Sequence, residues 1–579
     1  MRIPRKASVL LVALAVVPLA CSSGPDQPQT VAESFAQALS SGDAAAAAAL
    51  TDAPDQARQT LTTLFENLGT NDTVRVSATD EASFTLESTW KLGTGGQDEW
   101  TYTSTGTADE NDWKIDWNPA TVAPGLELGP LSYSPVPPKP ARVLDASGGE
   151  LMTEQVVTLV TIAPDADLPA VAAALAPHGV TEATLSADLG AAQGKPITAV
   201  ALREADIAPV RDALTGLRGV TLAPQPRLLT VDKTLAAPTL AGLTELWQHQ
   251  ADDAAGWAVR AHTPSGTQRI AGPDATATTD IATTLDIDLQ NAAEGALAPV
   301  PTPAAIVALR PSTGEVLAVA QNAPADAQGP IALTGLYPPG STFKTVTVSA
   351  ALQAGGVTAD TVLPCPGRAT IEGRTIPNDD GFDLGDVALH TAFARSCNTT
   401  MASLGVRLPA DGLTEAAAQL GLGVDYVTPG LTTVTGKVPA ARNPAQQVEA
   451  SIGQGTVTAS PFGMALVAAS LARGSAPAPS VVAGRPGTAD RQAEPVPVAV
   501  TAQVEAMMAE TVSAGTATAL RDIPGLLGKT GTAEYLDDQH AHGWFVGIRD
   551  DLAFAVFVAD AGSSGPAVES AGRMLRVTR

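Results

Sequence analysis

Apolar positions in the first part of the chain change from helical spacing to strict alternation. Two stretches with apolar residues every three or four positions come first, at 31–39 and 55–68. Four alternating segments follow, near Val74, Phe84, Trp100 and Trp113. Alternation with one apolar parity is typical of an antiparallel sheet with one buried face. The pattern predicts a small α+β module over residues 30–130, with two helices against a curved antiparallel sheet.

The rest of the chain predicts two further modules. Residues 131–141 are rich in proline and predict a linker, and residues 142–275 mix short strands with helices such as 168–175 and 208–217. Beyond residue 280, a helix is predicted over 342–353, because prolines precede it and two glycines follow. A strand pair is predicted at 542–549 and 552–559. The predicted fold class is α+β multidomain.

Length and charge narrow the class of protein. A chain of 579 residues suggests three or four domains. The net charge is −26, with 34 basic residues against 60 acidic ones. Because no basic patch appears, nucleic acid is a poor partner for this chain.

A short apolar run near the N-terminus indicates export. Three basic residues precede the run from Val9 to Ala20, which is too short to span a bilayer comfortably and fits a signal peptide over residues 1–21. Cys21, with small residues after it, resembles a lipoprotein cleavage site and is the predicted lipidation site, with residues 22–29 as a linker. Ordinary secretion or an uncleaved anchor is the alternative.

The sequence S-x-x-K occurs twice, and the secondary structure predicted around each copy shows which pair can act together. Ser88 and Lys91 lie in an alternating stretch, where positions i and i+3 face opposite sides of a strand and cannot cooperate. Ser341 and Lys344 lie at a predicted helix start, where i and i+3 are neighbours. A serine becomes a nucleophile only when a base takes its proton. Ser341 is therefore the candidate nucleophile and Lys344 the candidate base, unless Ser341 is merely a helix cap.

Two later motifs supply the groups that this chemistry needs. A lysine acts as a base only if its pKa falls, which burial and a second cation both cause. Lys529 is the predicted second cation, at the start of the strand segment Lys529-Thr530-Gly531-Thr532. Ser396 and Asn398 form an S-x-N sequence. We expect Ser396 to relay protons and Asn398 to bond Lys344 and the substrate amide.

An acyl donor is expected to lie antiparallel along the edge of this strand. Lys529 and Thr530 would meet its carboxylate, and Gly531 would permit close backbone approach. The backbone N–H groups of Ser341 and Thr532 would form an oxyanion hole.

The three motifs in this order resemble the active site of the penicillin-binding proteins and serine β-lactamases. The resemblance covers residues 280–579 and implies a transpeptidase domain, an antiparallel sheet flanked by helices. Residues 30–130 resemble the cone-shaped, NTF2-like N-terminal domain of some lipid-anchored penicillin-binding proteins. Residues 142–275 take the place of the pedestal, or dimerisation, domain of monofunctional ones.

This resemblance implies a serine-type D,D-transpeptidase that is acylated by β-lactams at Ser341. It would cross-link peptidoglycan stem peptides with D-Ala-D-Ala ends, on the extracytoplasmic side of the cell membrane, held by a lipid anchor and partnered by cell-wall synthesis proteins. A β-lactam hydrolase, a D,D-carboxypeptidase and a non-catalytic wall-complex protein or β-lactam sensor are the alternatives. A hydrolase is disfavoured, because no E-x-x-L-N segment between Asn398 and Lys529 supplies a deacylation glutamate.

The remaining cysteines and histidines leave questions open. Cys365 and Cys397 are an even pair in an oxidising compartment, so they could form a disulfide or remain two buried thiols. No cofactor or metal is predicted, because the six scattered histidines make no recognisable site. His540 and His542, close to the Lys529 strand, are expected to be surface loop residues.

Overall fold

The computed structural model describes residues 28–70, 72–235, 237–535 and 540–578. The chain divides into two compact units. The first combines the chain up to Pro138 with residues 254–277, and the second combines residues 139–253 with 278–579. Among the described residues, no helix is both long and apolar enough to cross a membrane.

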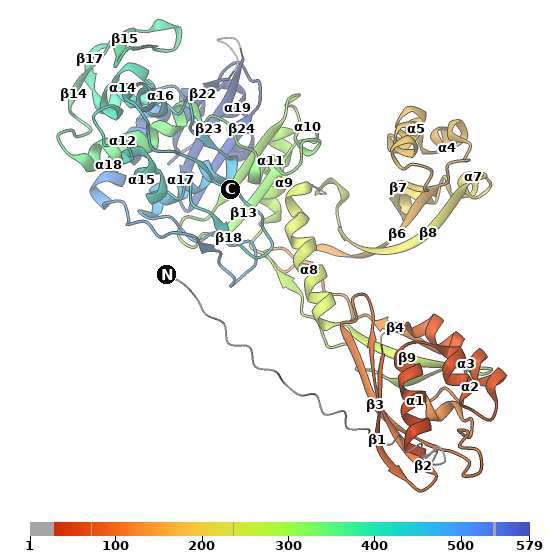
Figure 1. The fold of residues 1–579 in the computed structure, drawn as a ribbon. Helices are drawn as coiled ribbons and strands as arrows, with labels where there is room; N and C mark the ends of the chain where they lie inside the picture. The colour runs from red at the N-terminus through yellow and green to blue at the C-terminus, as the bar shows by residue number, and fades with distance from the viewer. Residues whose placement is uncertain (1–27, 71, 236, 536–539, 579) are drawn as a thin grey trace, which may run out of the picture. The chain divides into compact units, whose positions relative to one another are not determined.

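The first unit begins with three helices packed against a three-stranded antiparallel sheet (Figure 1). The helices are α1 (Pro28–Ser40), α2 (Ala44–Ala49) and α3 (Pro54–Leu68). The strands, paired in the order β1-β2-β3, are β1 (Asp72–Asp80), β2 (Ser83–Leu92) and β3 (Asp98–Thr107). Phe35, Leu61 and Trp90 lie in the shared core. The predicted α+β module is confirmed, with one helix, α2, that the sequence pattern did not predict.

The segment near Trp113, predicted as a fourth strand, is instead a turn. Trp113 has a φ of +54°, which a strand does not allow. Ile115 is fully buried and makes isolated bridges to Thr51 and Ala108. The apolar pattern there reflects the packing of single side chains rather than a strand.

A second sheet in this unit contradicts two predicted boundaries. The sheet has the order β10-β9-β4, with β4 (Leu131–Val136), β9 (Gly256–Thr263) and β10 (Gly266–Ala271). Residues 131–136 are therefore not linker, and the pedestal-like segment does not extend to residue 275. Pro135 is tolerated because β4 is an edge strand. The two pairing segments are far apart in sequence, so local patterns could not reveal the pairing.

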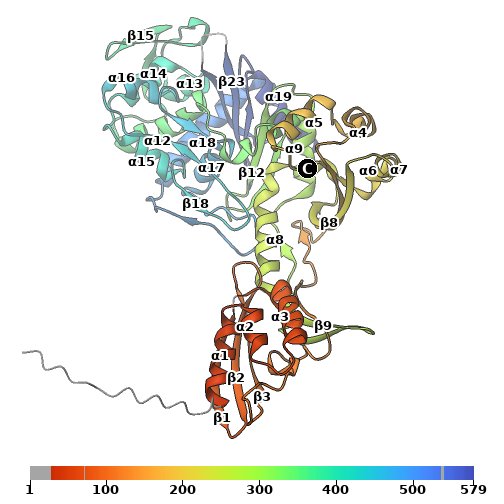
Figure 2. The same cartoon turned by 45° about the vertical axis from the view of Figure 1, so that its right-hand side comes forward.

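The pedestal-like part of the second unit is a sheet with its own small core. Long strands β6 (Glu150–Ile162) and β8 (Val220–Thr230) pair with each other, and Figures 1 and 2 both show helices gathered at one end of them. Val160, Val171 and Leu175 are fully buried there. The other elements are β5 (Val143–Leu144), β7 (Ile197–Arg203), β11 (Ile281–Ala282), α4 (Leu168–Leu175), α5 (Glu182–Ala191), α6 (Glu204–Ile207), α7 (Arg211–Thr215) and α8 (Ala241–Ala254).

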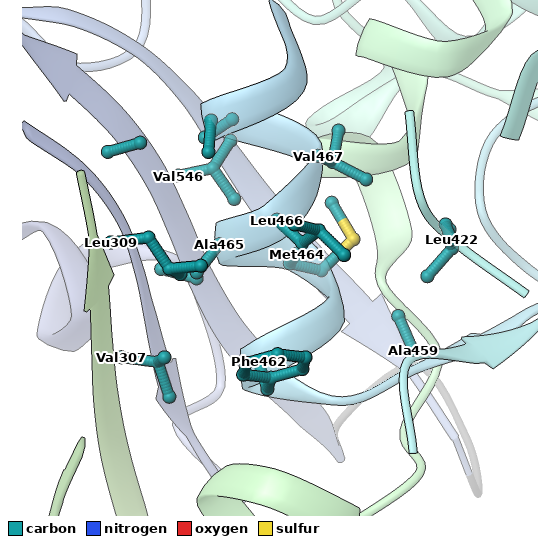
Figure 3. Packing of buried hydrophobic residues seen from close by; sticks show 14 of the residues in the cluster. Val307, Leu309, Leu422, Ala459, Phe462, Met464, Ala465, Leu466, Val467 and Val546 are labelled. Carbon is teal, nitrogen blue, oxygen red and sulfur yellow. The ribbon is translucent and has the colours of Figure 1, made fainter. Parts of the chain in front are cut away.

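The main sheet of the second unit has five antiparallel strands. Its order is β13-β12-β24-β23-β22, with β12 (Ala304–Leu309), β13 (Val316–Gln321), β22 (Leu527–Glu534), β23 (Ala541–Arg549) and β24 (Leu552–Val558). Alternate residues of β12 join different cores: Ile306 packs with α9 (Ile287–Leu297) and α19 (Gly565–Val577), and Val307 packs with α17 (Pro461–Arg473). Figure 3 shows Phe462 and Ala465 of α17 beside this sheet. The predicted antiparallel sheet with helices on both faces is confirmed.

The nucleophile-bearing segment lies among the remaining helices of this unit. The turn η5 (Gly340–Phe343) runs directly into α12 (Lys344–Ala354), which ends at Gly355 as predicted. Around them are α10 (Ala323–Asp326), α11 (Ile331–Thr334), α13 (Leu389–Ala394), α14 (Asn398–Gly405), α15 (Gly412–Gln419), α16 (Pro444–Ala450) and α18 (Val498–Ser513), and the small strands β14 (Val362–Cys365), β15 (Arg368–Ile371), β16 (Arg374–Pro377) and β17 (Gly385–Ala388).

Candidate active site

Ser341 lies in a tight turn that only a glycine can begin. Gly340 has a φ of +52°, and a Cβ atom there would lie 2.4 Å from the carbonyl oxygen of Thr532. Its N–H donates to the carbonyl of Gly453 at 3.0 Å. Ser341 and Lys344 are one 3₁₀ turn apart, a spacing at which side chains eclipse each other. The turn therefore sets Ser341 over Lys344 and against β22.

Lys344 is fully buried and makes three hydrogen bonds through its amine. Nζ donates to the carbonyl of Ser396 at 2.7 Å, to the Ser396 hydroxyl at 3.1 Å and to Oδ1 of Asn398 at 2.5 Å. Burial holds the pKa of Lys344 well below its ordinary value, and the charge of Lys529 lowers it further, against a smaller opposing effect of Asp379. Both effects favour the neutral amine that a general base requires, in which two N–H groups can donate and one lone pair can accept a proton.

Lys529 approaches the same hydroxyl from the sheet. Its Nζ donates to Oγ of Ser396 at 3.1 Å and to the carbonyl of Thr530 at 3.0 Å, and it lies 5.6 Å from the centre of the Phe393 ring. Burial lowers the pKa of Lys529 to about 7. The hydroxyl of Ser396 thus bridges two buried lysines, both with a lowered pKa.

Ser396 and Asn398 lie in a strained turn that is held in place by several bonds. Ser396 has a φ of +61°, in the left-handed region that non-glycine residues seldom adopt. Asn398 begins α14, and its Nδ2 donates to the carbonyl of Pro377 at 2.9 Å. A disulfide joins Cys397, between them, to Cys365 at the end of β14.

Strand β22 is an edge strand of the main sheet, and it passes beside the turn η5, which contains Ser341. The hydroxyls of Thr530 and Thr516 are 2.6 Å apart. A Cβ atom on Gly531 would lie 3.1 Å from the backbone nitrogen of Thr342. The close approach of β22 to η5 depends on this glycine, and it brings the backbone of Thr532 beside Gly340.

The structure therefore gathers the predicted site residues of the second unit: Ser341, Lys344, Ser396, Asn398, Lys529, Thr530, Gly531 and Thr532. The competing pair does not cooperate, because Ser88 is buried in its sheet while Lys91 is exposed. Cys21 lies outside the described residues.

One expectation about the histidines was wrong. His542, expected in a surface loop, is 7% exposed and lies in β23, where its Nδ1 accepts a hydrogen bond from the N–H of Asp560 at 3.2 Å. Two residues that contact the site residues, Asn378 and Thr516, were not predicted from the sequence, because neither belongs to a recognisable local motif.

Comparison with known proteins defines the class. The family model for the penicillin binding protein transpeptidase domain matches residues 304–575, and the model for the NTF2-like N-terminal transpeptidase domain matches residues 27–129. The chain therefore carries a penicillin binding protein transpeptidase domain, which contains the whole candidate site, and an NTF2-like N-terminal domain.

The relatives it matches carry specific names. Peptidoglycan D,D-transpeptidase PbpA of Mycobacterium tuberculosis is 32% identical over 305 residues, 45% of this chain and 61% of the relative. Peptidoglycan D,D-transpeptidase MrdA of Acinetobacter baumannii is 26% identical over 363 residues, 52% of this chain and 53% of the relative. The chain thus matches less than two thirds of the length of either relative. A solved D,D-transpeptidase domain of a peptidoglycan glycosyltransferase from Eggerthella lenta is 25% identical, with a TM-score of 0.45, covering 55% of this chain and 94% of that chain.

Proposed function

We propose that the protein is a serine D,D-transpeptidase that cross-links peptidoglycan stem peptides through an acyl-enzyme on Ser341. The observation that carries the proposal is the Ser396 hydroxyl, held 3.1 Å from the amines of both Lys344 and Lys529. A buried, neutral lysine one turn from a serine can take that serine's proton. The names of the relatives support the same activity.

In the acylation step, Lys344 takes the hydroxyl proton of Ser341 while Oγ attacks the carbonyl carbon of the penultimate D-Ala. The backbone N–H groups of Ser341 and Thr532 stabilise the developing oxyanion. Lys529 and Thr530 hold the terminal carboxylate of the donor. The peptide bond then breaks, Ser396 relays the proton to the departing D-Ala amine, and an ester remains on Ser341.

In the second step, the amine of a neighbouring stem peptide attacks this ester. A new amide bond forms, and Ser341 regains its proton. If water attacks instead, the result is carboxypeptidation. A β-lactam forms the same ester, but its opened ring keeps the leaving nitrogen attached, so the site stays occupied.

Labelling with a fluorescent penicillin tests the proposal. Mass mapping should place the label on Ser341, and Ser341→Ala should abolish it. Lys344→Ala should slow labelling by at least ~10²-fold, as the loss of a general base implies. A label on Ser88 or Ser396, or labelling that survives Ser341→Ala, would overturn the assignment of the nucleophile.

The proposal includes a lipid anchor on Cys21 that keeps the catalytic domain at the outer face of the cell membrane, near partners in cell-wall synthesis. Two acyl chains on one cysteine anchor a protein stably where a single chain would be marginal. The mature chain should begin at Cys21 and partition into detergent. Cys21→Ala should leave it unprocessed or released, with penicillin labelling intact. A mature N-terminus well beyond Cys21 would refute the anchor.

A further inference from the structure

A buried asparagine outside the three motifs connects to the S-x-N turn. Asn378 follows β16 and is 2% exposed. Its Oδ1 accepts the backbone N–H groups of Asn398 at 2.8 Å and Thr399 at 3.2 Å. These are the first two residues of α14, whose N–H groups have no partner within the helix. Asn378 therefore caps α14 from a distant part of the chain.

The nitrogen of the same Asn378 amide is also fully hydrogen-bonded. Its Nδ2 donates to the carbonyls of Phe382 at 2.9 Å and Pro366 at 3.0 Å, and it lies 3.4 Å from the sulfur of Cys365. Cys365 is in turn joined to Cys397 of the S-x-N turn. The Asn378 side chain thus connects the segment 365–382 to the start of α14. Its Nδ2 donates to carbonyls of the segment, and its Oδ1 accepts from N–H groups of the helix.

The hydrogen bonds of Asn378 also affect the contacts of the candidate base, Lys344. The side chain of Asn398 reaches Lys344, 2.5 Å from Oδ1 to Nζ, while the backbone of Asn398 is fixed by Asn378. The neighbouring Ser396 keeps a φ of +61°, which must be maintained by surrounding contacts. Losing the cap would let Asn398 and Ser396 move away from Lys344.

We propose that Asn378 is a positioning residue for acyl transfer: by capping α14, it sets the distances from Ser396 and Asn398 to the amine of Lys344. The proposal rests on the proposed function. It assigns no contact between Asn378 and the substrate.

The first test compares two asparagines that make equivalent bonds. Asn322 also accepts two backbone N–H groups, from Ala304 at 3.0 Å and Ala325 at 3.2 Å, and donates to the carbonyls of Val300 and Thr302. None of these partners belongs to the three motifs. Asn378→Ala and Asn322→Ala should lower the melting temperature to a similar extent.

Only one of the two variants should affect chemistry. Asn378→Ala should slow acylation by fluorescent penicillin ~10- to ~100-fold, the loss expected when a reacting group shifts by about 1 Å. Asn322→Ala should acylate at the wild-type rate. Equal rates in the two variants, whether both normal or both slow, would overturn the proposal.

Asn378→Asp provides a second test if Asn378→Ala does not fold. Buried beside the carbonyls of Pro366 and Phe382, the new carboxyl should be protonated, so it keeps an acceptor at the start of α14 and one donor toward these carbonyls. Its maximal acylation rate should therefore stay within ~3-fold of wild type, well inside the ~10²-fold loss from misplacement.

A maximal rate in Asn378→Asp that falls by the full ~10²-fold expected for misplacement would refute positioning through the capping oxygen. The failure of this inference is distinct from the failure of the proposed function. If wild-type protein takes no label on Ser341, the proposed function fails. If it takes the label and Asn378→Ala acylates at the wild-type rate, only the positioning role fails.

Discussion

Lys529 is a buried group whose charge should be visible in the stability of the protein. It is fully buried, and burial lowers its pKa from 10.5 to about 7. Because the pKa is lower in the folded than in the unfolded chain, the unfolded state binds more protons at neutral pH. Stability therefore rises with pH between about 7 and 10.5, and falls as the pH drops through this range.

The size of the effect follows from these two pKa values. Keeping Lys529 buried costs about 4 kcal/mol of folding free energy at pH 7 and about 2 kcal/mol at pH 9. Lys529→Met has a similar shape and no titrating group. Its lost hydrogen bonds to Ser396 and Thr530 change stability by an amount that does not depend on pH. Between pH 7 and 9, wild type should gain about 2 kcal/mol relative to Lys529→Met.

Urea unfolding of wild type and Lys529→Met at several pH values measures this difference. Lys437→Met removes an exposed lysine of the same unit, so its difference from wild type should stay constant with pH. If the difference for Lys529→Met also stays constant, to within about 0.5 kcal/mol, Lys529 is charged in the folded protein. The argument from burial would then be wrong.

Three further predictions concern the turn, the disulfide and the acyl-enzyme. Gly340→Ala should slow penicillin labelling more than ~10-fold, because its Cβ would lie 2.4 Å from the Thr532 carbonyl oxygen. Gly355→Ala, whose Cβ would have no atom within 4 Å, should label at the wild-type rate. Equal labelling rates in the two variants would contradict this prediction. Replacing both Cys365 and Cys397 by alanine should lower unfolding free energy by about 3 kcal/mol in urea titrations, and an unchanged midpoint would argue against the disulfide. The penicilloyl ester should be long-lived in mass spectra, so turnover of a chromogenic cephalosporin near ~10 s⁻¹ would favour a hydrolase.

The sequence alone determined the parts of the site that depend on near neighbours. A helix with prolines before it and glycines after it must bring positions i and i+3 together, which pairs Ser341 with Lys344. The same geometry excludes Ser88 and Lys91, because a strand turns them to opposite faces. The strands at 541–549 and 552–558 were also predictable, since a short turn joins them. In each case, the deciding contacts lie within a few residues.

Only the tertiary structure decided the features that join distant segments. The pairing of β4 with β9, the cap that Asn378 places on α14 and the burial of His542 all depend on residues far apart in sequence. The same holds for the electrostatics: the sequence suggests two lysines, but only burial on all sides lowers the pKa of Lys529 to about 7. Desolvation is a property of the assembled surroundings, and no local pattern of residues encodes it.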